Sequence, residues 1–336
     1  MDSLTHVVVG ACLGEAFAGR TLGKKAMAWG ILAHSIPDID FLATPWLGSV
    51  DNLLVHRGFT HSILFTILVS LFLSIIARRL HNSYSLSFLR WFSFLAASMT
   101  LHIVLDAFNT YGVGWFEPFS NYRISFNLIY VADPFFSIAP GIACIMLLLL
   151  KNANPYRKIF WKLGLGISFI YGTYCVFNKT TATKQANRVL THNRIEYTKL
   201  MITPGPLQPW LWFFAAGTDT GYFTGYVSVF DREPTAALKY SPKNDSLLLL
   251  VANKKEVEKL VRFSQNYYTV EQHADTILFN DLRFGQIIGW QNPSERFAFY
   301  YYLNPPLDNT LAVQRGRFTK WDRQSVHSLM QRIKGN

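Results

Sequence analysis

Six of the nine histidines lie in the first third of the chain, and five of them, all but His81, have a carboxylate near them in the sequence. These five occur in four short stretches, "MDSLTH" (Asp2, His6), "HSIPDID" (His34, Asp38, Asp40), "HRGFTHS" (His56, His61) and "LHIVLD" (His102, Asp106). His102 and Asp106 are four residues apart, so on a helix they share one face. Such a pair can bind one ion together, or one side chain can orient the other as a ligand.

A single histidine in a membrane helix is often only a packing residue, and carboxylates at a helix end are often only solvated. Four separate segments that bring His and Asp to the same end favour a metal site instead. Imidazole and carboxylate ligands without a thiolate suit Zn²⁺, with Mn²⁺ and Fe²⁺ as alternatives, in a catalytic site. The sequence therefore predicts a divalent metal site with the ligands His6, Asp38, Asp40, His56, His61, His102 and Asp106.

These are more ligands than one tetrahedral ion needs, so we expect one or two ions. Two ions that share a bridging carboxylate activate water and bind phosphoryl or acyl oxygens. Asp38 or Asp40 would bridge or act as a base, and His56 would be a ligand or an acid/base group. Arg57 and Thr60 would hold an anionic group of the substrate, because the planar guanidinium suits phosphate. The alternative for Arg57 is a membrane anchor at the lipid headgroups.

The composition indicates which elements position these residues. Of 336 residues, 50% are hydrophobic and only 16% are charged, whereas soluble domains have about 25% charged residues. The net charge is +11, but the basic residues form small clusters between apolar runs, so an anionic membrane surface is favoured as a partner and nucleic acid is not. The sequence leaves the oligomeric state open. The three cysteines lie in apolar segments without metal-type spacing, which predicts buried thiols.

Four segments have the roughly 17–22 apolar residues that a membrane crossing requires. They are 60–77, 89–110, 134–150 and 159–177. Two shorter segments rich in Ala and Gly, 4–18 and 26–42, are expected to form a closely packed hairpin. From about residue 180, short aromatic or β-branched stretches alternate with turn residues, and helices are expected at 254–265 and at the chain end. The predicted fold is a polytopic α-helical membrane bundle of about six membrane helices, the first two short (1–178), followed by a soluble, mainly β (α+β) domain (179–336).

The basic residues favour one orientation of this bundle in the membrane. Up to residue 178, only Arg57 and Arg123 lie on the side of the His/Asp stretches. The opposite loops carry Arg20, Lys24, Lys25, Arg78, Arg79, Arg90, Lys151, Arg157, Lys158 and Lys162. Because Lys and Arg are enriched in cytoplasmic loops, we expect a multi-pass protein of the inner (plasma) membrane. Its metal site and C-terminal domain would face the extracytoplasmic side.

Four motifs carry a resemblance to a known family. "MDSLTH", "PDID", "HRGFTHS" and "HIVLD" followed by "NTYG" resemble, in order and spacing, the YdjM-like family of membrane-bound proteins assigned as metal-dependent hydrolases. The resemblance covers residues 1 to about 140 and implies the metal ligands already named; "TPGPLQPWLW" and "DLRFG" look like the extended bacterial members.

A more distant similarity is to the metal sites of zinc-dependent phospholipase C and single-strand nucleases. Their ligand order is similar to His6, Asp40, His61 and His102/Asp106. After Asp106 the next histidine is His192, so the second H-x-x-x-E/D helix of those sites is not expected here, which favours one or two ions over three.

The predicted function is a membrane-bound hydrolase that uses metal-activated water. Because the site lies at helix ends near the headgroups, we expect a membrane lipid or lipid-linked substrate, with a phosphoester bond favoured. The alternatives are a lipid amide or ester hydrolase, and a non-catalytic metal-binding scaffold or sensor.

Overall fold

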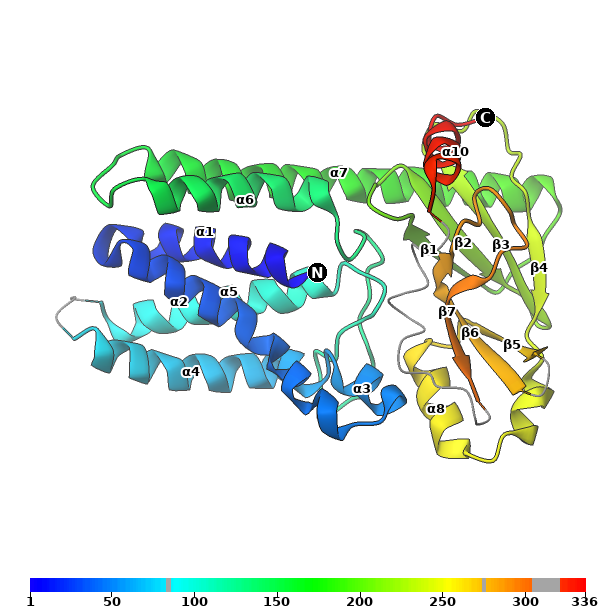
Figure 1. Ribbon diagram of the computed structural model, residues 1–336, viewed down its shortest axis with the longest axis horizontal. Coiled ribbons are helices and arrows are strands. Elements are labelled where there is room, and N and C mark those ends of the chain that lie inside the picture. The colour runs from blue at the N-terminus through cyan, green and yellow to red at the C-terminus, as the bar shows by residue number, and fades with distance from the viewer. Residues whose placement is uncertain (83–85, 274–275, 304–320) are drawn as a thin grey trace. The chain divides into compact units, whose positions relative to one another are not determined.

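The chain forms two units that differ in secondary structure (Figure 1). The computed structural model describes residues 1–82, 86–273, 276–303 and 321–336. A helical unit comprises Met1–Leu47 and Val55–Tyr174, and a β unit comprises Gly48–Leu54 and Cys175–Asn336. The helical N-terminal region and the antiparallel sheets of the C-terminal region confirm these two parts of the predicted fold.

The long helices of the helical unit lie side by side (Figure 1). They are α1 (Ser3–Leu22), α2 (Lys24–Ser35), α4 (Ile63–Leu80), α5 (Phe88–Asp106), α6 (Pro134–Leu149) and α7 (Arg157–His192), whose last part belongs to the β unit. Side-chain caps set where several of them begin. Asp2 accepts a hydrogen bond from the N–H of Thr5, and Ser62 accepts one from the N–H of Phe65. Such caps satisfy N–H groups that have no partner within the helix.

Among the residues that the structure describes, three helices are long and apolar enough to cross a membrane: α4, α5 and α7. Helix α6 is also apolar but has only 16 residues. Large apolar side chains such as Phe72, Ile138 and Phe169 are exposed on these helices, as expected of surfaces that face lipid. The transmembrane character is therefore supported, but these lengths do not confirm the predicted number of about six crossings.

The predicted helix over 26–42 is too long. Helix α2 ends at Ser35, and a 3-10 segment, η1 (Ile36–Trp46), follows. Pro37 explains the change, because proline has no N–H to donate to the carbonyl four residues earlier and its ring clashes with that carbonyl. Asp38 and Asp40 therefore lie on the tighter 3-10 segment. Conversely, α7 continues well past the predicted end at residue 177.

Glycines allow α1 and α2 to pack closely, as the sequence predicted for this hairpin. A Cβ atom added to Gly14 would lie 2.0 Å from the Ala26 carbonyl oxygen, and one added to Gly30 would lie 2.0 Å from the Gly10 carbonyl oxygen. The turn between the helices uses Gly23, whose φ of 57° lies in the left-handed region that favours glycine. This packing brings the start of α1 against the end of α2, where His6 and His34 lie 5.2 Å apart between ring centroids.

We expect Gly30→Ala to destabilise the protein, because the new methyl group meets backbone that cannot move aside. Overpacking typically costs about 1–3 kcal/mol. The melting temperature of the detergent-purified protein measures the effect. Gly166→Ala on α7 is the matched control, because a Cβ there meets nothing within 4 Å, and alanine is the better helix former by about 1 kcal/mol. Equal melting temperatures for the two variants would contradict the close packing.

The described residues of the β unit form two antiparallel sheets. The four-stranded sheet has the order β1 (Lys199–Pro204), β2 (Leu211–Gly217), β3 (Gly221–Ser228), β4 (Lys239–Pro242); the other has β5 (Tyr268–His273), β6 (Thr276–Gln286), β7 (Phe297–Tyr302). The other elements within the described ranges are α3 (Ser49–Val55), η2 (Phe59–His61, in the helical unit), η3 (Asp245–Leu250), α8 (Lys254–Phe263) and α10 (Arg323–Ile333).

Strand β2 is buried on both faces. Trp212 and Phe214 pack with Val189 of α7, whereas Phe213 on the opposite face packs with Leu282 of β6. The alternation follows from the two-residue period of a strand, and it joins the end of α7, the first sheet and the second sheet through one strand.

Candidate metal centre

The His/Asp residues of the first third of the chain lie at one end of the helical unit. His6 lies in the first turn of α1, and His102 and Asp106 lie in the last turns of α5. His34 lies in the last turn of α2, Asp38 and Asp40 on η1, and His61 at the end of η2, directly before the Ser62 cap of α4. Helix and 3-10 termini from five elements therefore supply the candidate ligands.

Four of these residues form the tightest group, which we call the metal group: Asp38, His61, His102 and Asp106. One ligand atom from each lies within 4.8 Å of the others. The Nε2 atom of His61 lies 3.4 Å from Asp38 Oδ1 and 3.3 Å from Asp106 Oδ2. It also lies 3.2 Å from the Nε2 atom of His102.

Hydrogen bonds on the other side of each ring orient the Nε2 atoms. The Nδ1–H of His102 donates to the carbonyl oxygen of His34 at 2.5 Å, so its Nε2 carries the lone pair in the neutral ring. The Nδ1 atom of His61 lies 3.1 Å from Thr60 Oγ1 and 3.5 Å from Asp40 Oδ2. Burial lowers the pKa of His61 to about 3, so this ring is neutral near neutral pH and can act as a ligand.

This arrangement fits a cation. Two Nε2 atoms and two carboxylate oxygens face each other, and a lone pair beside a carboxylate oxygen is repulsive unless a positive charge lies between them. Counting side chains alone, Asp38, Asp40 and Asp106 carry three negative charges against the single positive charge of Arg57. The amino group of Met1 also pairs with Asp106. A divalent ion would balance the negative charge that remains, and the donor set suits zinc or another borderline divalent metal.

A second group lies deeper and shares His102 with the first. His6, His34 and His102 place one ring nitrogen each within 4.8 Å of one another. His34 Nδ1 donates to the carbonyl oxygen of Ser98 at 2.7 Å. Its Nε2 atom and His6 Nδ1 are buried and make no hydrogen bond within the described residues. Burying a polar nitrogen without a hydrogen-bond partner costs free energy. These two nitrogens are therefore available as metal ligands.

His34 was left out of the predicted ligand set. A sequence signal for it existed, because His34 precedes Asp38 by four residues, the same spacing that pointed to His102 and Asp106.

Asp40 lies beside the metal group and binds the loop that contains His56 and Arg57. Its carboxylate accepts hydrogen bonds from the Arg57 N–H at 2.8 Å and from Thr60 Oγ1 at 3.3 Å, and His56 Nδ1 lies at 3.2 Å. Burial by itself would raise the pKa of Asp40, but the bonds from His56 and the Arg57 N–H hold it below the usual value. Asp40 is therefore ionised and holds this loop in place.

Two of the predicted site residues face solvent more than the others. The side chain of Asp38 is 25% exposed and that of His56 is 40% exposed, whereas those of His61, His102 and Asp106 are fully buried. A molecule from outside the helical unit would therefore meet Asp38 and His56 first.

Arg57 is buried and contacts two of the three carboxylates. Its φ of 61° lies in the left-handed region, which is strained for a non-glycine residue. In this conformation the backbone N–H faces Asp40 while Nε lies 3.0 Å from Asp106 Oδ2. The remaining guanidinium nitrogens donate to Asn109 Oδ1 at 2.7 Å and to the Met1 carbonyl at 3.2 Å. Arg57 thus positions Asp106; its binding of a substrate anion stays a prediction.

Comparison with known proteins identifies similar chains. A family model described as "YdjM inner membrane protein" matches residues 1–182, which include both His/Asp groups. The inner membrane protein YbcI of Escherichia coli (strain K12) is 33% identical over 122 residues, 36% of this chain and 69% of that protein. The uncharacterized protein YfhP of Bacillus subtilis (strain 168) is 32% identical over 146 residues, 41% of this chain and 44% of that protein. No solved structure matches.

Proposed function

The chain belongs to the YdjM family of inner membrane proteins, and from this premise we propose that it is a membrane-bound, metal-dependent hydrolase of a lipid phosphoester. The observation that carries the proposal is the metal group, in which the Nε2 atoms of His61 and His102 lie 3.2 Å apart beside Asp38 and Asp106. Zinc is favoured, with Mn²⁺ and Fe²⁺ as alternatives, and the second group offers a place for a second ion. A divalent ion in such a site makes bound water acidic enough to act as a nucleophile near neutral pH.

Separate roles for the solvent-facing residues follow from their contacts. Asp38 both belongs to the metal group and faces solvent, so it can accept a proton from an attacking water. His56 is held through Nδ1 by the ionised Asp40, and when its ring is protonated on both nitrogens it can donate the Nε2 proton to a leaving group. Thr60 lies between Asp40 and His61 and can donate a hydrogen bond to a substrate oxygen once its bond to Asp40 rearranges.

Exposed apolar residues near the metal group support a lipid substrate. Segment η1, which carries Asp38, exposes Phe41, Leu42 and Trp46, and the loop that pairs with Arg57 and Ile63 exposes Phe116 and Phe119. Aromatic side chains of this kind are enriched where membrane meets water. An amphiphile in the membrane could present its ester bond to the metal group. The asymmetry of basic loops supports an extracytoplasmic position for the site and the C-terminal domain.

The proposal is tested with purified protein loaded with Zn²⁺, Mn²⁺ or Fe²⁺ and offered phospholipids and polyprenyl phosphates in mixed micelles. We expect release of phosphate or headgroup, whereas release of fatty acid would indicate a lipid ester or amide hydrolase. His56→Gln should keep the metal but lower turnover by about 10²–10⁴-fold, the usual contribution of a general acid. His192→Gln, at an exposed position at the end of α7, should leave turnover unchanged.

One observation favours the alternative of a non-catalytic metal-binding scaffold or sensor. Three of the four side chains in the metal group are fully buried, as in structural metal sites. Tight metal binding without release of any product from these substrates would support this alternative and overturn the hydrolase.

A further inference from the structure

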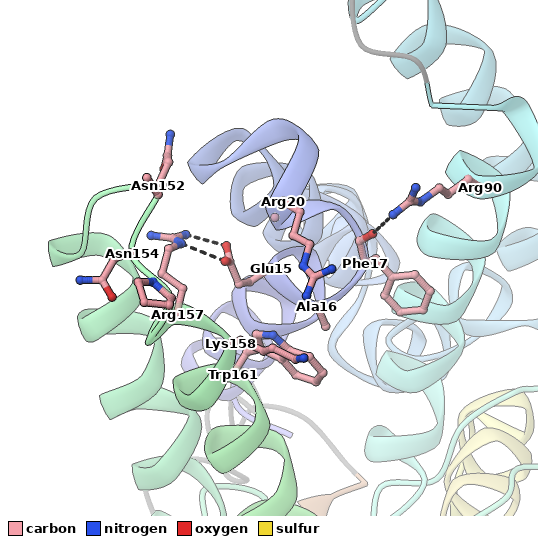
Figure 2. A pocket seen from close by; sticks show the side chains of 13 residues that line it. Glu15, Ala16, Phe17, Arg20, Arg90, Asn152, Asn154, Arg157, Lys158 and Trp161 are labelled. Carbon is pink, nitrogen blue, oxygen red and sulfur yellow. Dashed lines mark hydrogen bonds and ion pairs between the residues drawn. The ribbon is translucent and has the colours of Figure 1, made fainter.

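A pocket of about 530 Å³ opens at the end of the helical unit opposite the metal group (Figure 2). It lies between the last turns of α1, the start of α5, and the α6–α7 loop with the first turns of α7. Along α1, Arg20 at the pocket is fourteen residues from His6 at the other end, about 21 Å at the helical rise. The pocket is therefore separate from both His/Asp groups.

The pocket is strongly basic. Its lining contains four cationic side chains, Arg20, Arg90, Arg157 and Lys158, and a single carboxylate, that of Glu15. Arg157 is already neutralised by Glu15, and Arg90 donates to the carbonyl oxygen of Phe17 at 3.3 Å. Figure 2 shows both contacts as dashed lines.

Arg20 and Lys158 are the two available cations. Both side chains are exposed, and within the described part of the chain neither makes a hydrogen bond or ion pair with a protein group. Arg20 comes from α1 and Lys158 from α7, so an anion between them would contact both helices. Two converging cations in a concave site match the several oxygens of a phosphate group.

Apolar residues in and beside the pocket favour the phosphate of a lipid over free phosphate. Phe17 and Trp161 supply apolar lining within the pocket. Directly after Lys158, α7 exposes Ile159 and Leu163, and beside Arg90, α5 exposes Leu89. An acyl chain attached to the bound phosphate could lie along these helices in the membrane. Basic pockets between membrane helices bind anionic headgroups in this way.

We propose that this pocket binds the phosphate headgroup of an anionic membrane phospholipid, with Arg20 and Lys158 contacting the phosphate and Trp161 packing against the glycerol and upper acyl region. The proposal rests on the pocket and not on the proposed hydrolase function. The bound lipid would be a structural component of the helical unit, at the end opposite the metal group.

The test measures lipid binding to the full chain. Delipidated protein in detergent is titrated with phosphatidylglycerol or phosphatidylcholine, and bound lipid is counted by native mass spectrometry. We expect one tightly bound phosphatidylglycerol per chain, with an affinity at least tenfold above that for phosphatidylcholine. The double variant Arg20→Gln/Lys158→Gln should lose at least tenfold in affinity for phosphatidylglycerol.

The matched control removes the same charge elsewhere at this end. Arg78→Gln/Arg79→Gln changes two exposed cations in the last turn of α4, outside the pocket, and should bind phosphatidylglycerol within about twofold of wild type. The charge-preserving variant Arg20→Lys/Lys158→Arg should retain most of the binding, which excludes a loss of fold as the cause. Equal losses in the pocket and control variants, or no preference for phosphatidylglycerol, would overturn the proposal. Displacement of the lipid by millimolar inorganic phosphate would indicate a site for free phosphate and would also overturn it.

Discussion

Replacing His61 by alanine is expected to empty the metal group. Wild-type protein purified in Zn²⁺ should contain about one tightly bound ion per chain, and His61→Ala should bind it at least about 100-fold more weakly. Residues that only orient a ligand already contribute about 10–100-fold to metal affinity, and His61 faces Asp38 and Asp106 through its own Nε2. Metal analysis of the two proteins after dialysis against a weak chelator measures the difference.

Two further variants show that the loss comes from the site. His192→Ala removes an exposed imidazole at the end of α7 and should leave the metal content unchanged. Asp40→Asn keeps the shape of a side chain that lies outside the metal group but binds the loop of His56 and Arg57. It should weaken metal binding by about 10–100-fold, less than the loss of a direct ligand. Wild-type metal content in His61→Ala would exclude the metal group as the binding site.

Replacing Glu15 by alanine is expected to destabilise the protein by about 3–5 kcal/mol, because it leaves the charge of Arg157 buried without its partner. The two side chains are only 6% and 3% exposed. Their contact is bidentate, with Arg157 Nε 2.9 Å from Oε1 and a terminal nitrogen 2.5 Å from Oε2. Arg157 also donates to the carbonyl oxygens of Leu147 and Leu150, so the pair joins α1 to the end of α6 and the start of α7. Equilibrium unfolding in detergent measures the change.

The controls for this prediction separate charge burial from loss of packing. Glu196→Ala removes an exposed carboxylate and should change the free energy of unfolding by less than about 0.5 kcal/mol. Glu15→Ala/Arg157→Met should be more stable than Glu15→Ala alone, because no unpaired charge remains buried. The double variant will not recover fully, since the carbonyls of Leu147 and Leu150 lose their donor. If Glu15→Ala is as stable as Glu196→Ala, the Glu15–Arg157 pair contributes nothing to the free energy of unfolding.

Much of the helical unit follows from local sequence. Apolar length and the caps at Asp2, Ser62 and Asp133 determine where α1, α4 and α6 begin, because capping is a contact between near neighbours. Among the predicted helix ends that were wrong, that of the second segment is explained by Pro37, which lies within the segment. The extension of α7 had no apolar signal, because after residue 177 its buried face packs on β2 in the β unit and not in a membrane.

The candidate site was predictable in composition but not in its contacts. His102 and Asp106 share one helix face by their spacing, and the other His/Asp stretches were expected at the same end of the bundle. The sequence could not separate the metal group from Asp40, which binds the loop beside it through His56 and the N–H of Arg57. Nor did it indicate that Arg57 would be turned towards Asp106 by a left-handed backbone conformation.

What the sequence by itself determined is the membrane character of the N-terminal half, the β character of the C-terminal part, and the residue types available for a metal. These properties depend on periodicity and on groups within a few residues of each other. The tertiary structure alone decided which ring nitrogens face each other, that His34 joins His6 and His102, and that a basic pocket opens around Arg20 and Lys158. Those arrangements bring together residues 28 to 138 positions apart in the sequence, and their geometry depends on how closely whole helices pack, as the glycines of α1 and α2 show.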